Sequence, residues 1–98
     1  MTGPAILDEI WDTIEDRVSS PVPGSYTTHI LSHRKGIDKA LEKVGEEATE
    51  LILAIKNGEK NSITGEAADL IYHTLLALKA AGVSPSEVYE ELRARRKL

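Results

Sequence analysis

The residues from Gly36 to Asn57 carry the pattern that most restricts how this chain can fold. Their apolar side chains recur every three or four residues and, at 100° per residue, fall within an arc of about 120°. Such a stripe is typical of an amphipathic helix that packs along one side. We therefore predict a long helix over residues 36–57. Its apolar stripe comprises Ile37, Ala40, Leu41, Val44, Ala48, Leu51, Ile52 and Ile55.

The segment before this helix shows helical spacing interrupted by a loop. Apolar residues among acids predict a first helix over residues 5–17. Two prolines and a glycine within residues 19–26 indicate a loop. A short helical segment over 27–33 is expected next, and it ends near Gly36.

The segment after the long helix is predicted to be helical too. A turn over residues 56–61, with Asn57-Gly58 as the helix end, leads to a helix over 62–81. The sequence Ser84-Pro85-Ser86-Glu87 has the form of a capping box with proline at the first helical position, so it begins a last helix. No segment shows strand-like alternation. We predict an all-α fold, a small bundle of four to five helices forming one domain over residues 1–98.

The amount of apolar helix surface suggests that one copy does not complete the bundle. The chain has 98 residues, no Phe and one Trp, so its core must be aliphatic. Lys79 is the only full charge between Leu70 and Ala81, and apolar residues surround this helix almost completely. A helix of this kind is buried on most sides, which is difficult to arrange in so short a chain. We therefore predict a homodimer.

Composition excludes several classes of protein. The net charge of −4 is unlike the basic face of a nucleic-acid-binding protein. The absence of cysteine excludes a disulfide framework and a zinc–thiolate site. The N-terminal stretch is acidic and unlike a signal peptide, and no apolar run approaches the roughly 18 residues of a membrane span. We expect a cytoplasmic protein that binds neither nucleic acid nor membrane.

Two pairs of acids have the spacing of metal ligands. Glu47 and Glu50 are three residues apart, so they share one face of the long helix. Glu66 and Asp69 repeat the spacing on the next helix, after a gap long enough for a turn and an antiparallel return. Carboxylates on so apolar a helix are costly unless they are paired or bind a cation. We predict that the two pairs face each other around a cation.

The ligand types favour a particular ion. Oxygen ligands without cysteine favour Mg²⁺, with Mn²⁺ as a possible substitute. The alternative is a di-iron carboxylate bundle, which places His three residues after Glu. Here that position holds Asp69 after Glu66, and Glu50 after Glu47. Because Mg²⁺ commonly binds through substrate phosphates, these acids imply a polyphosphate ligand.

Basic and hydroxyl residues for such a ligand stand nearby in the sequence. Lys35, Lys39 and Lys43 are spaced by four residues, and Arg34 lies beside the first of them. The loop at residues 23–27, PGSYT, offers backbone N–H groups and hydroxyls that could hold an anion.

Each of these features also has an ordinary structural explanation. The acids and lysines could form solvated pairs along one helix, namely Lys39–Glu42, Lys43–Glu46 and Lys43–Glu47. His73 taken alone is more often a hydrogen-bonded structural histidine, and Ser25 and Thr27 could be helix caps. Tyr72 and Trp11 are expected to be packing residues.

Three sequence stretches, in this order, resemble the phosphoribosyl-ATP pyrophosphohydrolase family, whose members are MazG-like all-α nucleoside triphosphate pyrophosphohydrolases. The stretches are PGSYT at 23–27, KGIDKALEKVGEEATELILAIKNGEK at 35–60 and EAADLIYH at 66–73. The superfamily signature E-x-x-E followed by E-x-x-D is only moderately specific, whereas the combination of the three stretches is far more so. The resemblance covers residues from about 6 to 95.

The resemblance implies an activity and a set of site residues. The activity is Mg²⁺-dependent hydrolysis of phosphoribosyl-ATP to phosphoribosyl-AMP and pyrophosphate, the second step of histidine biosynthesis. The metal carboxylates of the family map onto Glu47, Glu50, Glu66 and Asp69. The catalytic residues expected are Glu46, a candidate base, with Glu47 and Glu50. The substrate-binding residues expected are Ser25, Tyr26, Arg34, Lys39, Lys43 and His73.

Two other functions compete with this one. A house-cleaning pyrophosphatase for non-standard nucleoside triphosphates would share the metal signature, although the GSYT sequence argues against it. A non-catalytic helical dimerisation module would share the helices and bind no Mg²⁺.

Overall fold

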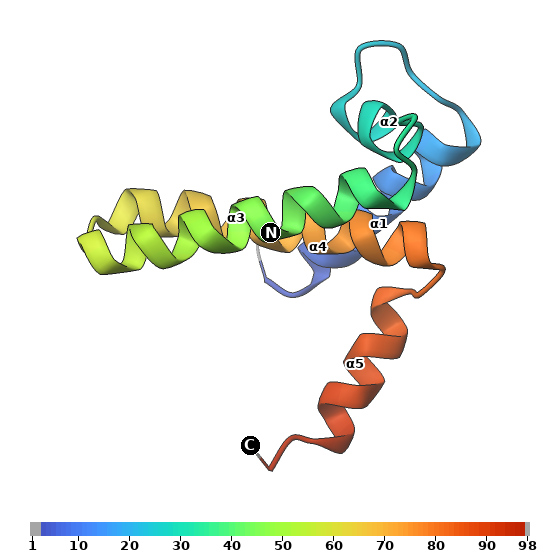
Figure 1. Ribbon diagram of the computed structural model, residues 1–98. Coiled ribbons are helices and arrows are strands. Elements are labelled where there is room, and N and C mark those ends of the chain that lie inside the picture. Colours follow the sequence, from blue (N-terminus) through green and yellow to red (C-terminus); the bar gives the residue numbers. More distant parts are fainter. Residues whose placement is uncertain (1–2, 98) are drawn as a thin grey trace.

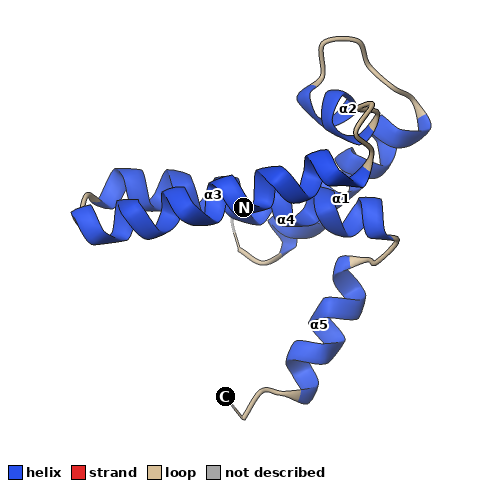
Figure 2. Ribbon diagram, in the orientation of Figure 1, coloured by secondary structure: helices blue, strands red, loops and turns tan. Residues whose placement is uncertain are grey.

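The computed structural model describes residues 3–97. Its helices in this range are α1 (Ala5–Ser19), α2 (Tyr26–Leu31), α3 (Ile37–Asn57), α4 (Lys60–Ala81) and α5 (Pro85–Ala94). None of the residues 3–97 lies in a strand (Figure 2). The predicted all-α fold is therefore confirmed, while its completion by a second copy stays a prediction.

The connection between α3 and α4 is tighter than the predicted turn. Gly58 ends α3 in the left-handed conformation, with φ of 73°, and its N–H bonds back to the carbonyls of Ala54 and Ile55. Glu59 is already extended, and its carbonyl accepts the N–H of Ile63. The helix therefore begins at Lys60, and the prediction that it began at residue 62 was two residues late.

Side-chain caps set the ends of the shorter helices. Ser25 Oγ accepts the N–H of Thr28 at 3.3 Å, so α2 begins at Tyr26 and ends at Leu31, slightly earlier than predicted at both ends. The capping box of α5 is present, because the backbone N–H of Ser84 donates to Glu87 Oε2 at 2.8 Å and that of Glu87 donates to Ser84 Oγ at 3.4 Å.

The core lies at one end of a hairpin formed by α3 and α4. The two helices pack along each other, and α1 and α2 cover the end that holds the start of α3 and the end of α4 (Figure 1). The opposite end of the hairpin, with the α3–α4 turn, projects away from α1 and α2 (Figure 1). The buried apolar cluster consists of Ile14, Ile30, Ala40, Leu75 and Leu76.

Much of the apolar surface predicted to be covered is exposed in the single chain. On α3, Leu41 is 52% exposed and Ile52 is 62% exposed, whereas Ala40 is buried. On α4, Ile71 is 49% exposed, whereas Leu75 and Leu76 are buried. One copy therefore covers only part of the apolar stripe of α3.

Within residues 3–97, the helices lack the combination of length and apolar content needed to cross a membrane.

Candidate metal and nucleotide site

Acids from α3 and α4 converge where the two helices pass each other. One carboxylate oxygen from each of Glu47, Glu66 and Asp69 lies within 4.8 Å of the others. The two-residue connection between the helices makes this possible, because it returns α4 antiparallel to α3 with little offset. The structure thus brings together three of the four acids expected to hold a metal, from both predicted pairs.

The fourth acid, Glu50, acts on the same cluster. The pKa of Glu66 is raised by burial first, then by the adjacent Glu50 carboxylate, and further by the charges of Asp69 and Glu47. Four acids therefore affect one another here, and a cation between them would relieve their repulsion.

Two carboxylate oxygens of the cluster have no hydrogen-bond partner among residues 3–97. Oε2 of Glu47 and Oε2 of Glu66 are buried, and neither accepts a hydrogen bond from another group of residues 3–97. Glu47 is only 8% exposed. Buried carboxylate oxygens normally accept hydrogen bonds or bind a metal. The donor set, hard and all-oxygen, fits Mg²⁺ or Mn²⁺.

Lys43 is the lysine that contacts the cluster. Its Nζ lies 2.9 Å from Glu46 and 3.7 Å from the buried Glu47. The hydrogen bond to Glu46 raises the pKa of Lys43, so its ammonium stays charged. Glu46 itself is half exposed, at the outer edge of the cluster.

The remaining basic residues are not gathered at the acids. Lys35 and Lys39 both approach Glu42, at 3.1 Å and 3.9 Å, instead of continuing a stripe toward Glu47. Arg34 is exposed in the turn between α2 and α3. The three ordinary helix pairs anticipated from the spacing of the lysines and glutamates are all present. A role for Lys39 and Arg34 toward a substrate stays a prediction.

The first residues of α2 are tied to α4 one turn beyond Asp69. The Tyr26 hydroxyl lies 2.8 Å from His73 Nε2, and His73 Nδ1 lies 2.7 Å from the backbone carbonyl of Asp69. The hydroxyls of Thr27 and Tyr72 are also hydrogen-bonded to each other. These contacts hold Tyr26 and Thr27, the last two residues of PGSYT, close to the acid cluster.

The ordinary roles foreseen for several of these residues are present. His73 is 6% exposed with both ring nitrogens engaged, and Ser25 caps α2. Tyr72 was expected to pack, which it does, but its bond to Thr27 was not foreseen. The sequence did indicate that Tyr72 makes such a bond, because a tyrosine hydroxyl on an otherwise apolar helix needs a polar partner.

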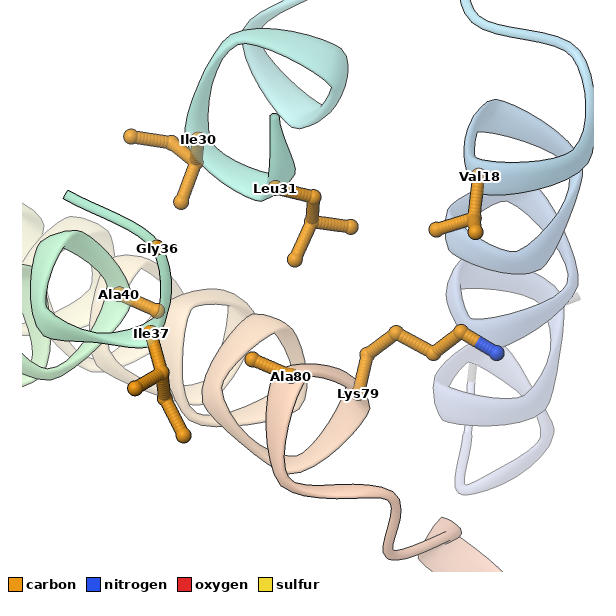
Figure 3. A pocket seen from close by; sticks show the side chains of 8 residues that line it. All are labelled: Val18, Ile30, Leu31, Gly36, Ile37, Ala40, Lys79 and Ala80. Carbon is orange, nitrogen blue, oxygen red and sulfur yellow. The ribbon is translucent and has the colours of Figure 1, made fainter. Parts of the chain in front are cut away.

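A hollow at the other end of the hairpin holds none of the acids. It has a volume of about 250 Å³ and lies among α1, α2, the start of α3 and the end of α4 (Figure 3). Its one charged side chain, Lys79, extends toward α1 (Figure 3), where Nζ lies 3.6 Å from Glu15 and 5.6 Å from the centre of the Trp11 ring. Lys79 therefore braces α4 against α1, and the hollow offers a ligand little beyond apolar walls.

Comparison with known proteins shows the family of the chain. Residues 7–96 match the family model described as phosphoribosyl-ATP pyrophosphohydrolase. A phosphoribosyl-ATP pyrophosphatase of Methanosphaerula palustris is 61% identical over 97 residues, covering 99% of this chain and 98% of the relative. Proteins of the same name from Methanocorpusculum labreanum and Methanoculleus marisnigri are 55% and 54% identical, covering 98% and 94% of this chain and 93% and 95% of the relatives. The chain belongs to the phosphoribosyl-ATP pyrophosphohydrolase family.

Proposed function

We propose that this protein hydrolyses the α–β phosphoanhydride of phosphoribosyl-ATP, giving phosphoribosyl-AMP and pyrophosphate in the second step of histidine biosynthesis. Its relatives carry the name of this activity over nearly their whole length. The observation that carries the proposal is the convergence of Glu47, Glu66 and Asp69, with two buried oxygens that have no hydrogen-bond partner in the described range 3–97. A divalent cation that also binds a triphosphate would provide a partner for the carboxylate oxygens of that cluster.

The acids would hold Mg²⁺, with Mn²⁺ as a substitute. Glu47, Glu66 and Asp69 supply the oxygens that lie closest together, and Glu50 stands beside Glu66. When bound, Mg²⁺ neutralises phosphate charge and polarises the attacked phosphorus. The raised pKa of Glu66 supports this assignment, because a group that resists ionisation in the empty cluster gains most from a nearby cation.

The other residues of the chain would orient the substrate and move a proton. Lys43, held by Glu46 and Glu47, places a permanent positive charge where phosphate charge develops. Glu46 is half exposed at the edge of the cluster and is the candidate base that takes a proton from the attacking water. The bridging P–O bond breaks as the new P–O bond forms, and pyrophosphate leaves.

We propose further that the working protein is a homodimer in the cytoplasm. The large apolar side chains of α3 and α4 that are exposed in one copy support the dimer. Equilibrium sedimentation tests it, since a chain that stays monomeric at micromolar concentration would contradict the proposal.

A substrate panel tests the activity. Pyrophosphate release is measured with phosphoribosyl-ATP and with a set of canonical and non-standard nucleoside triphosphates, each with Mg²⁺. We expect phosphoribosyl-ATP to have the highest kcat/KM. A preference for a non-standard triphosphate would instead indicate a house-cleaning enzyme. Failure of calorimetry to detect Mg²⁺ binding, with or without a triphosphate, would indicate a non-catalytic module.

A further inference from the structure

The hydrogen bonds around His73 fix which of its ring nitrogens carries the hydrogen. Nδ1 lies 2.7 Å from the backbone carbonyl of Asp69, which can only accept a hydrogen bond. Nδ1 therefore donates. In the neutral imidazole the other nitrogen, Nε2, is then an acceptor.

This arrangement determines the direction of the hydrogen bond between Tyr26 and His73. The hydroxyl oxygen lies 2.8 Å from His73 Nε2, so Tyr26 donates to that nitrogen. Burial raises the pKa of Tyr26, so the phenol keeps the hydrogen it donates. The phenolic oxygen is left with lone pairs only, and it can only accept from any further partner.

Tyr26 is placed where a nucleotide can reach it. Its side chain is 43% exposed and helps to line an open hollow of about 540 Å³, together with Gly24, Ser25, Thr28 and His29. Its hydroxyl is hydrogen-bonded to His73, whose Nδ1 lies 2.7 Å from the backbone carbonyl of Asp69, one of the clustered acids. The ammonium of Lys43 is already engaged by Glu46 and Glu47. The bond between Thr27 and Tyr72 holds the same segment at a second point.

We propose that the Tyr26 phenolic oxygen selects the nucleotide by accepting a hydrogen bond from it, given by either a ribose hydroxyl or the amino group of the base. His73 is the positioning residue, because its bond to Tyr26 leaves the phenolic oxygen able only to accept. The inference rests on the proposed function and names the part of the substrate that Tyr26 contacts. A phosphate oxygen has no hydrogen to donate at neutral pH, so Tyr26 is not a phosphate ligand, although its loop resembles an anion cradle.

The first test pairs a variant with substrate analogues. The kcat/KM values of wild type and Tyr26→Phe are measured for phosphoribosyl-ATP and for analogues that each lack one donor. The analogues are the 2′-deoxy and 3′-deoxy forms of each ribose and the form whose base amino group is replaced by oxygen. A single net hydrogen bond corresponds to about 2- to 12-fold. We expect wild type to discriminate against one analogue by that factor and Tyr26→Phe to lose this discrimination alone.

The analogue that responds identifies the donor as a ribose hydroxyl or the amino group. If Tyr26→Phe lowers kcat/KM equally for every analogue, or leaves every ratio unchanged, the acceptor role is overturned. A second readout is inhibition by inorganic pyrophosphate, which contains only the phosphate part of the substrate. Its inhibition constant should be the same in wild type and Tyr26→Phe, and weaker inhibition of the variant would show that Tyr26 binds phosphate after all.

The second test uses two replacements of His73 that separate its two bonds. The Gln side chain can place an acceptor oxygen near the position of Nε2, so His73→Gln keeps the Tyr26 contact. The shorter Asn side chain can donate to the Asp69 carbonyl but does not reach Tyr26. We expect His73→Asn to lose the analogue discrimination like Tyr26→Phe, and His73→Gln to retain it, with unchanged helical circular dichroism in both. Equal loss in the two variants, or full discrimination in His73→Asn, would overturn the positioning role.

The results of these tests distinguish failure of this inference from failure of the proposed function. If the wild-type protein does not hydrolyse phosphoribosyl-ATP, the proposed function fails. If it does so with high kcat/KM and Tyr26→Phe shows the same analogue ratios, only the present inference fails.

Discussion

The two ends of the α3–α4 hairpin are stabilised in different ways. At the end covered by α1 and α2, Ile14 and Leu76 are fully buried and the packing is apolar. At the projecting end (Figure 1), Ile52, Leu53 and Ile55 are each more than half exposed. Between the two ends lie the acids, with two buried oxygens that accept no hydrogen bond from the part of the chain that the structure describes. The chain thus holds its fold at one end, and we propose that the rest of the hairpin binds a cation, a nucleotide and a second copy.

The largest expected effect on stability lies at the covered end. Leu76→Ala should lower the free energy of unfolding by about 2–5 kcal/mol, because it removes a fully buried side chain and leaves a cavity. Urea denaturation followed by circular dichroism measures the change. A cost below about 1 kcal/mol would mean that this end does not hold the fold.

A large effect on activity, without loss of fold, is expected at the acids. Glu47→Gln should lower kcat/KM by more than about 100-fold, the upper range for residues that only support metal ligands. Helical circular dichroism should not change. The matched control is Glu90→Gln, which neutralises an exposed glutamate of α5 and should keep near-normal activity. Near-normal activity in Glu47→Gln would remove this residue from the site.

A small and concentration-dependent effect is expected at the projecting end. Ile52→Ala should change the unfolding free energy of the dilute chain by no more than about 0.5 kcal/mol, because the side chain is 62% exposed. At higher concentration the variant should self-associate more weakly, which sedimentation measures. A cost equal to that of Leu76→Ala at every concentration would show that the two ends do not differ.

The smallest effect is a gain in stability from neutralising an acid. The pKa of Glu66 lies above its ordinary value of 4.5 in the metal-free protein, so the unfolded chain ionises more readily than the folded one. The charge therefore destabilises the fold above about pH 4.5, and the penalty disappears as the pH falls below that value. Glu66→Gln should unfold at a higher temperature than wild type at neutral pH, and at nearly the same temperature at pH 4.

The matched control for this stability gain is Glu90→Gln, which should show no such pH-dependent difference. Mg²⁺ should raise the Tm of wild type and have less effect on Glu66→Gln. If Glu66→Gln is less stable than wild type at neutral pH without Mg²⁺, the inference that the charge of Glu66 destabilises the metal-free fold is contradicted.

Local chemistry explains why the helices and the pairing of the acids were predictable. The apolar stripe of α3, the end at Gly58 and the capping box at Ser84 depend on neighbours within a few residues. The convergence of Glu47 with Asp69 follows from two helical spacings and a short connection. The connection itself proved shorter than expected, because Glu59 already caps the next helix, which begins at Lys60.

The features that could not be predicted depend on contacts between distant parts of the chain. The bond between Tyr26 and His73 joins residues 47 positions apart, and no local spacing indicates it. Only Lys43 of the predicted lysine stripe contacts the acids, because Glu42 pairs with both Lys35 and Lys39. Which apolar residues stay exposed depends on where α1 and α2 pack, and the helical period alone does not determine that.

The most direct test of the metal site is anomalous diffraction from crystals grown with Mn²⁺ and a non-hydrolysable triphosphate. The predicted result is an anomalous peak enclosed by the carboxylates of Glu47, Glu66 and Asp69, with phosphate oxygens on its open side. Carboxylates that point apart into solvent, with no peak among them in any copy, would contradict the account.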